Sequence, residues 1–292
     1  MRNKGDWMLL VAAIIGGGGF IGVKYLLDWG YNPYQVMFVR FLIATICLSL
    51  VYSKKFRGIS KNEWKMGGIL GALLAATFLL LTVGLQYTTP SVNAFLCNTQ
   101  AVIVPFICWW AFRQKPMPSC FIAAFLTLAG VALLSVTEDF WIDIGAILSF
   151  GASVAFSIQM ALMGKVVKEC DSVHIALVEH LTVTVISFMI VLFTGIHMPP
   201  LNGMAVGSFL FVGIFCTALY FVLQSIGQKY TSANKTAIII TSESIFAAII
   251  SALFYGERMG WRGFVGCGII FAAMLLAEKP MGKPVDSSVK IG

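Results

Sequence analysis

The sequence predicts an all-α polytopic membrane protein, with ten transmembrane helices arranged as two inverted five-helix repeats around a central cavity. Of its 292 residues, 59% are hydrophobic and only 11% are charged, whereas a soluble domain carries about 25% charged residues. Apolar runs repeatedly reach the roughly 20 residues that a helix needs to cross a bilayer core. An internal repeat is the third observation, and it divides the chain into halves.

The ten expected spans follow one another through short loops, which leave no room for a soluble domain. They cover residues 7–27, 33–53, 66–86, 92–112, 119–136, 142–163, 173–194, 204–224, 236–254 and 262–278. The first run lacks a convincing small-residue cleavage site, so we expect it to remain as a helix rather than to act as a signal peptide.

Basic residues collect in alternate loops, as the positive-inside rule predicts for a multi-pass protein. One side receives most of them, whereas the other receives only Lys24, Arg258 and Arg262. Both termini are therefore expected in the cytoplasm, and the protein is expected in the cytoplasmic membrane of a prokaryote. The net charge of +7 is then a topology signal, and nucleic acid is not expected as a partner.

Cofactor and metal chemistry find no support in the sequence. The seven cysteines form no CxxC pair, and a cysteine within an apolar helix usually acts as a small packing residue. No HExxH, GxSxG or paired-aspartate motif occurs, so we expect neither an enzyme, a metal site nor a cofactor. The lipid bilayer and a small-molecule substrate are the expected partners, and a monomer is expected.

The two halves of the chain resemble each other at a constant offset of 143 residues. Tyr87 pairs with Tyr230, Gly84 with Gly227 and Gln100 with Glu243 within "GLQYTTPSVNAFLCNTQ" and "GQKYTSANKTAIIITSE". Five spans per half is an odd number, so homologous halves must cross the membrane in opposite directions, as in many secondary transporters. We place the first repeat at residues 1–139, the second at 140–280 and a cytoplasmic tail at 281–292.

Several longer pieces resemble the drug/metabolite transporter superfamily, in its ten-helix EamA branch. They are "GGGGFIGVKYLLDWGYNPYQVMFVRFLIA", "PFICWWAFRQKPMPSCFIAAFLTLAGVALL" and "IFAAIISALFYGERMGWRGFVGCGIIFAAMLLAE". The matching positions are Lys24, Pro33, Arg40, Phe41, Pro105, Gly130, Gly256, Glu257 and Arg258. The sequence departs from the family pattern at Arg113-Gln114-Lys115. The resemblance implies a ten-helix bundle with a central cavity that exports amino acids or other small metabolites, and it does not specify the substrate.

Glu243 lies near the middle of an apolar span, where an ionisable group is costly and usually faces the bundle interior or a wet cavity. Its repeat mate Gln100 is expected at the same depth. Helical spacing groups Asn93 with Gln100 on span 4 and Thr236 with Glu243 on span 9. These side chains are therefore candidates for the cavity.

Span 8 carries a polar stripe at helical spacing, formed by Thr217, Tyr220, Gln224 and Gln228. Such a stripe in an apolar helix is typical of a cavity lining, although hydrogen bonds that only join helices explain it as well.

Further cavity candidates are Thr77, Phe156, Gln159, Arg40 and His180. Arg40 has three interpretations: an ion-pair partner of Glu243, a site for a substrate carboxylate, or a side chain that snorkels to the interface. His180 suits proton coupling because histidine titrates near neutral pH, but a packed, hydrogen-bonded histidine is the commoner case.

Two features suggest bending of helices. Gly16, Gly17, Gly18 and Gly19 follow one another in span 1, and glycine permits either bending or close helix contact. Pro105 removes a backbone donor within span 4 and is expected to kink it. Both are candidates for a hinge or gate.

The predicted function is an exporter of amino acids or small amphipathic metabolites that works by alternating access, with Glu243 exchanging protons for substrate. An uncoupled facilitator or channel-like permease is the alternative.

Overall fold

The computed structural model describes residues 2–54, 58–135, 143–195 and 199–278, and these residues form helices joined by short loops, with no strand among them. The expected tail at 281–292 and the expected repeat boundary at 139–140 lie outside the described residues. The helices are α1 (Arg2–Asp28), α2 (Pro33–Val51), α3 (Lys61–Tyr87), α4 (Pro90–Cys97), α5 (Gln100–Phe112), α6 (Pro118–Ser135), α7 (Ile144–Glu169), α8 (Ser172–Thr194), α9 (Gly203–Leu210), η2 (Phe211–Leu219), α10 (Tyr220–Lys229), α11 (Ala233–Ile250), η3 (Ser251–Tyr255) and α12 (Trp261–Glu278).

Eight helical segments among the described residues are long and apolar enough to cross a membrane. Three of them are composite: α4 with α5, α9 with η2 and α10, and α11 with η3. Helices α6 and α12 are apolar too, but their apolar stretches, Pro118–Val131 and Trp261–Leu276, are shorter. The chain is therefore a multi-pass helical membrane protein.

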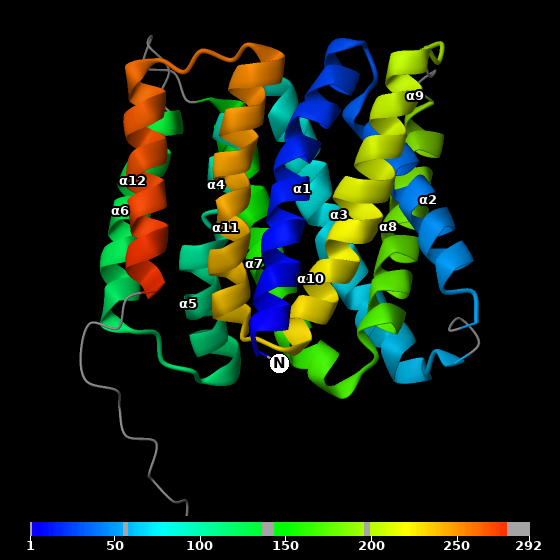
Figure 1. Ribbon diagram of the computed structural model, residues 1–292, viewed down its shortest axis with the longest axis horizontal. Coiled ribbons are helices and arrows are strands. Elements are labelled where there is room, and N and C mark those ends of the chain that lie inside the picture. Colours follow the sequence, from blue (N-terminus) through cyan, green and yellow to red (C-terminus); the bar gives the residue numbers. More distant parts are fainter. Residues whose placement is uncertain (1, 55–57, 136–142, 196–198, 279–292) are drawn as a thin grey trace, which may run out of the picture.

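The helices stand side by side between two faces of the molecule (Figure 1). Successive segments alternate in direction when each composite segment is counted once. Helix α1 begins and α12 ends at the same face, here called the N face. Helices α7 and α10 both run toward this face, whereas α1 and α3 run away from it.

Polar residues in the loops start most helices by satisfying the first free backbone N–H groups. Asn32 with Gln35 forms a capping box at α2, and Ser60 with Glu63 forms one at α3. Single side-chain caps begin α4, α7, α8, α9 and α11. Because lipid offers no hydrogen bonds to the backbone, these caps define where the chain can enter the apolar region.

Packing between the two halves follows a paired pattern. The contact of α3 with α7 corresponds to that of α10 with α1. Likewise, the contact of α1 with α11 corresponds to that of α7 with α4 and α5. Helix α3 also packs on α8, as η2 does on α2, while α2 contacts α8 directly. Helices α6 and α12 pack against each other at one edge of the bundle, where Gly130 lets α6 approach Gly266 and Ile270 closely (Figure 1).

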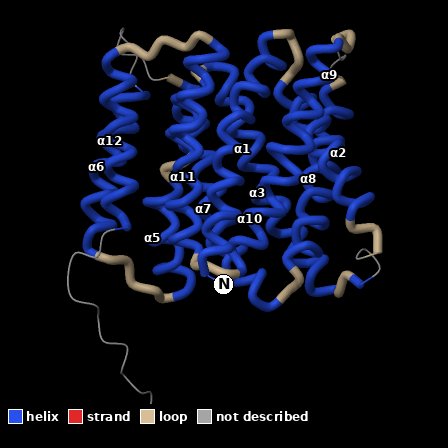
Figure 2. The backbone as a smooth tube through the Cα atoms, in the orientation of Figure 1, coloured by secondary structure: helices blue, strands red, loops and turns tan. Residues whose placement is uncertain are grey.

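Three segments depart from regular α-helix. Residues Asn98 and Thr99 interrupt the fourth span between α4 and α5, and Figure 2 shows this as a short loop at mid-height. Helix α5 continues through Pro105, so the interruption lies six residues before the proline that we expected to bend the helix. The other two segments, η2 and η3, are π-helices, which are rare and are often found at functional sites.

Candidate functional site

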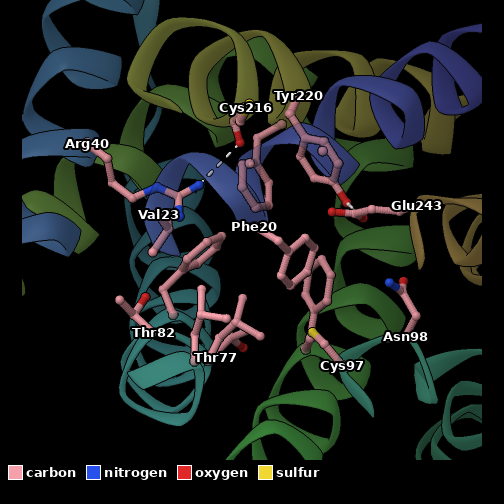
Figure 3. A pocket seen from close by; sticks show the side chains of 17 residues that line it. Phe20, Val23, Arg40, Thr77, Thr82, Cys97, Asn98, Cys216, Tyr220 and Glu243 are labelled. Atoms are coloured by element: carbon pink, nitrogen blue, oxygen red, sulfur yellow. Dashed lines mark hydrogen bonds between the residues drawn. The ribbon is translucent and has the colours of Figure 1, made fainter. Parts of the chain in front are cut away.

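A small cavity, with a volume of about 50 Å³, lies in the middle of the bundle (Figure 3). Both halves of the chain contribute to its wall. Its lining consists of Gly16, Gly19, Phe20, Val23, Arg40, Thr77, Phe78, Leu81, Thr82, Leu85, Cys97, Asn98, Phe156, Cys216, Tyr220, Phe221 and Glu243.

The cavity is displaced toward the face opposite the N face. On α1 its lining residues fall between Gly16 and Val23, and on α3 they fall between Thr77 and Leu85. Both ranges lie in the second half of helices that run away from the N face. On α10 the last lining residue is Phe221, two residues into a helix that continues toward the N face. The cavity therefore ends inside the bundle, short of the N face.

Glu243 lies in the cavity wall on α11, and only 8% of the residue is exposed. Its carboxylate accepts a hydrogen bond of 3.1 Å from the hydroxyl group of Tyr220 on α10. Gly16 provides the space for this carboxylate, because a Cβ atom at that position would lie 2.5 Å from Glu243 Oε1 and 2.7 Å from the Tyr220 ring. The three residues thus join α1, α10 and α11 at one point.

Arg40 is buried on the other side of the same cavity (Figure 3). Its Nε donates to Thr217 Oγ1 at 3.0 Å, and its Nη2 donates to the carbonyl oxygen of Cys216 at 3.3 Å. The guanidinium also lies 4.5 Å from the ring centroid of Phe78, a favourable cation–π arrangement. Among the described residues Arg40 forms no ion pair with Glu243, and its burial shows that it does not snorkel to the interface.

The π-helix η2 provides the acceptors for Arg40. Thr217 Oγ1 donates to the carbonyl oxygen of Val212, five residues earlier, which is the spacing of a π-helix. Within this π-helix the backbone carbonyl of Cys216 and the hydroxyl group of Thr217 both accept from Arg40, whereas the Cys216 thiol points toward Ile15 on α1. Thr217 therefore contributes by holding Arg40 and does not itself line the cavity.

The cavity thus has one acid, one base and mostly apolar walls. Phe20, Phe78, Phe156 and Phe221 provide aromatic surface, while Thr77, Thr82 and Asn98 add neutral polar groups. This arrangement can bind a small molecule with opposite charges at separate positions and an apolar body between or beside them.

Seven of the residues predicted for a cavity or hinge do line this one: Glu243, Tyr220, Arg40, Thr77, Phe156, Gly16 and Gly19. Gly17 and Gly18 instead face neighbouring helices. Helix α1 is continuous through the four glycines, and a hinge there stays a prediction.

Gln100, the predicted repeat mate of Glu243, is fully buried but does not line the cavity. Its Nε2 donates to Asn98 Oδ1 at 3.2 Å, and Asn98 occupies the cavity wall in its place. The interruption at Asn98 and Thr99 explains the difference, because it breaks the helical spacing that would group Gln100 with Asn93. The polar run "CNTQ" was the available signal for this interruption.

Asn93 and Thr236 also lie outside the cavity wall. Asn93 Nδ2 donates to Ser149 Oγ at 2.7 Å and to the carbonyl oxygen of Leu81, so it joins α4 to α7 and α3. Thr236 Oγ1 donates within its own helix to Ser232. Both side chains have structural contacts that explain their burial.

Gln159, His180 and Gln224 are fully buried on the N-face side of the cavity. Gln159 donates to Glu179 at 2.6 Å, and His180 Nδ1 lies 2.7 Å from the carbonyl oxygen of Ala176. The His180 ring packs 5.4 Å from that of Phe221. Gln159 and Gln224 therefore belong to a second, polar layer beyond the Phe221 ring, although spacing along the helices had predicted them in the cavity wall.

Comparisons with known proteins agree with this architecture. The model of the EamA-like transporter family matches twice, at residues 3–136 and 143–278. An uncharacterized transporter of Archaeoglobus fulgidus is 27% identical over 277 residues, which cover 95% of this chain and 86% of that protein. The uncharacterized transporter YcbK of Bacillus subtilis is 24% identical over 91% of this chain and 90% of its own length. A solved crystal structure has the same fold, with a TM-score of 0.70 and 12% identity, over 95% of this chain and 97% of that one.

Proposed function

Because the chain belongs to the EamA-like transporter family, we propose that it exports amino acids or other small amphipathic metabolites across the cytoplasmic membrane by alternating access. The observation that carries the proposal is the pair of opposite charges, Arg40 and Glu243, on an otherwise mainly apolar cavity.

A zwitterionic amino acid fits these groups. Arg40 has N–H groups that can pair with a carboxylate, and Glu243 can accept from an ammonium group. Phe20, Phe78, Phe156 and Phe221 would surround an apolar side chain. A hydrogen bond to a charged group contributes about 1.5–3 kcal/mol, so each contact is worth about ten- to a hundredfold in apparent affinity.

An inverted repeat is supported by contacts of the repeat-mate glycines. A Cβ atom at Gly84 would lie 3.0 Å from the carbonyl oxygen of Gly145 on α7, and one at Gly227 would lie 3.1 Å from that of Gly5 on α1. The first contact lies where α3 ends and the second where α10 ends, at opposite faces of the molecule. The paired helix packing described above has the same symmetry.

We further propose that the N face is cytoplasmic. The described loops and helix ends at this face carry most of the basic residues, including Arg113, Lys115, Lys165, Lys168 and Lys229, as the positive-inside rule requires. The cavity would then face outward, with the cytoplasmic side closed. Such one-sided closure favours a carrier over a channel.

The experiment is counterflow into proteoliposomes that contain purified protein and are preloaded with unlabelled L-leucine. External labelled L-leucine is compared with 3-methylbutylamine, which lacks the carboxylate, and 4-methylpentanoate, which lacks the ammonium group. We expect accumulation of leucine and about tenfold weaker competition by either analogue. The panel includes phenylalanine and methionine to cover other apolar side chains.

Two results would refute parts of the proposal. Equal competition by leucine and both analogues would show that Arg40 and Glu243 do not bind the carboxylate and the ammonium group of the substrate. Flux that neither saturates nor shows counterflow, while the empty liposomes stay tight, would indicate a channel.

A further inference from the structure

A layer of aromatic rings closes the cavity on its N-face side. The ring of Phe221 lies at the centre, with centroids 5.8 Å from Phe78, 6.4 Å from Phe156 and 5.4 Å from His180. These rings come from α10, α3, α7 and α8. On α3, α7 and α10 these rings lie at the N-face end of the cavity lining. Only Thr77, which precedes Phe78 on α3, lies nearer to the N face.

A second, polar layer lies directly beyond the rings. Gln159 follows Phe156 by three residues on α7, and Gln224 follows Phe221 by three residues on α10. Since both helices run toward the N face, both glutamines lie about one helical turn nearer to it. Glu179 on α8 joins this layer through its 2.6 Å hydrogen bond with Gln159, and all three residues are 0% exposed.

The hydrogen-bonding groups of this layer do not balance. Gln159 Nε2 donates to the Glu179 carboxylate, and Gln228 Nε2 donates to the carbonyl oxygen of Met160 at 2.7 Å. These acceptors fix the orientation of both amides. Among the described residues no donor reaches Gln159 Oε1, Glu179 Oε2, Gln224 Oε1 or Gln228 Oε1, whereas the unpaired groups that can donate are Gln224 Nε2 and the hydroxyl group of its neighbour Ser225.

Buried polar groups are almost always paired, so several unpaired acceptors in one layer require a reason. A layer built only to hold helices together would pair its donors with its acceptors. An excess of oxygen acceptors that includes a carboxylate instead matches a guest that supplies N–H donors and positive charge, as an ammonium group does.

A depression at the N face leads toward the same layer. It lies between α5, α7 and the start of α11 and is lined in part by Gly164, Lys165, Lys168 and Ala233. Gly164 adjoins Gln228, since a Cβ atom there would lie 3.2 Å from Gln228 Nε2. The polar layer is thus close to a solvent-accessible surface at the N face and is separated from the central cavity by the rings.

We propose that Gln159, Glu179, Gln224 and Gln228 form an inner binding station, which takes the ammonium group of the transported compound when the path opens at the N face. This inference rests on the proposed transport function. Glu179 supplies the negative charge, and the glutamine oxygens supply neutral acceptors. The ring layer around Phe221 separates this station from the outer one at Glu243.

The test measures charge recognition at the layer without a known substrate. In a cysteine-free background, Gln224→Cys is exposed to the cationic reagent trimethylammonium-ethyl methanethiosulfonate and to the anionic sulfonatoethyl analogue. Both reagents are membrane-impermeant and are applied to everted and to right-side-out vesicles. The measured quantity is the ratio of the cationic to the anionic reaction rate, before and after Glu179→Gln.

We expect Gln224→Cys to react from the N face, and Glu179→Gln to lower the rate ratio at least fivefold. The basic residues of the depression influence the rate ratio equally with and without Glu179→Gln. A change in the ratio therefore measures the effect of the Glu179 charge. The matched control is Thr82→Cys in the central cavity, whose ratio Glu179→Gln should leave unchanged. Glu179→Asp keeps the charge and should keep most of the ratio, and Ser225→Cys serves as a second reporter.

The inner station is overturned if the ratio at both reporters is unchanged by Glu179→Gln, or if neither reporter reacts from the N face. In either case, labelling of Thr82→Cys from the opposite face together with leucine counterflow would leave the proposed function intact. Loss of counterflow for the wild-type protein, with the expected ratio change at residue 224, would refute the proposed substrate class alone.

Discussion

The hydroxyl group of Tyr220 donates a hydrogen bond to the carboxylate of Glu243 at 3.1 Å, and this contact connects α10 with α11 in the wall of the central cavity. The phenol is the hydrogen-bond donor that the described residues provide to this carboxylate. It therefore orients the acid toward the cavity and partly offsets the loss of its hydration.

Tyr220→Phe should weaken transport while preserving the fold. The substitution removes one hydrogen bond to a carboxylate, worth about 1.5–3 kcal/mol if the acid is charged, and leaves the ring packing with Phe221 intact. We expect KM for leucine counterflow to rise about tenfold. Tyr255→Phe, which removes the hydrogen bond to Asp28 near the opposite face, is the control and should leave KM nearly unchanged.

Glu243→Gln should separate substrate orientation from proton coupling. The amide can still accept from Tyr220, but it can neither gain nor lose a proton in the transport cycle. If Glu243 exchanges protons for substrate, an imposed pH gradient drives leucine accumulation in wild-type proteoliposomes and not in the variant. Counterflow without a gradient should persist in the variant, with a higher KM. A gradient response that is equal in both proteins would remove Glu243 from the coupling step.

Lysine should not restore the function of Arg40 in the variant Arg40→Lys. The guanidinium uses two different nitrogens to reach Thr217 and Cys216 while it stacks on Phe78, and an ammonium group lacks this planar geometry. We expect both Arg40→Lys and Arg40→Met to reduce competition by 4-methylpentanoate more than competition by 3-methylbutylamine. Equal loss for the two analogues, with an unchanged melting temperature, would contradict a carboxylate site at Arg40.

The glycine run should respond unequally to alanine. A Cβ atom at Gly17 would lie 2.8 Å from the backbone nitrogen of Ala247 and 3.0 Å from the carbonyl oxygen of Glu243, so Gly17→Ala must push α1 away from α11. At Gly18 the nearest atom would belong to the Phe211 ring, 3.2 Å away, which can move. Gly17→Ala should therefore lower the melting temperature in detergent, and Gly18→Ala should change it little. Similar melting temperatures for the two variants would argue that the α1–α11 contact is not tight.

Spacing along the helices predicted which face is buried but not the depth of each side chain. Glu243 and Tyr220 line the cavity, whereas Thr236 and Gln224, on the same regular helices, lie outside its wall. Gln100 follows an interruption at Asn98 and Thr99, and a change of one residue rotates a side chain by about 100° around a helix. Thr217 lies within a π-helix, so its side chain holds Arg40 rather than facing the cavity.

The sequence by itself determined the class of protein, its approximate helical spans and the offset between its halves, because hydropathy and repeat spacing are properties of the chain alone. Only the tertiary structure decided which buried polar residues meet at Glu243 and which lie beyond Phe221. The reason is physical: helical periodicity specifies a face of one helix, whereas a binding layer depends on the depth, rotation and neighbours of several helices at once. That an acceptor such as Glu179 Oε2 lacks a partner can be recognised only when the positions of all surrounding donors are known.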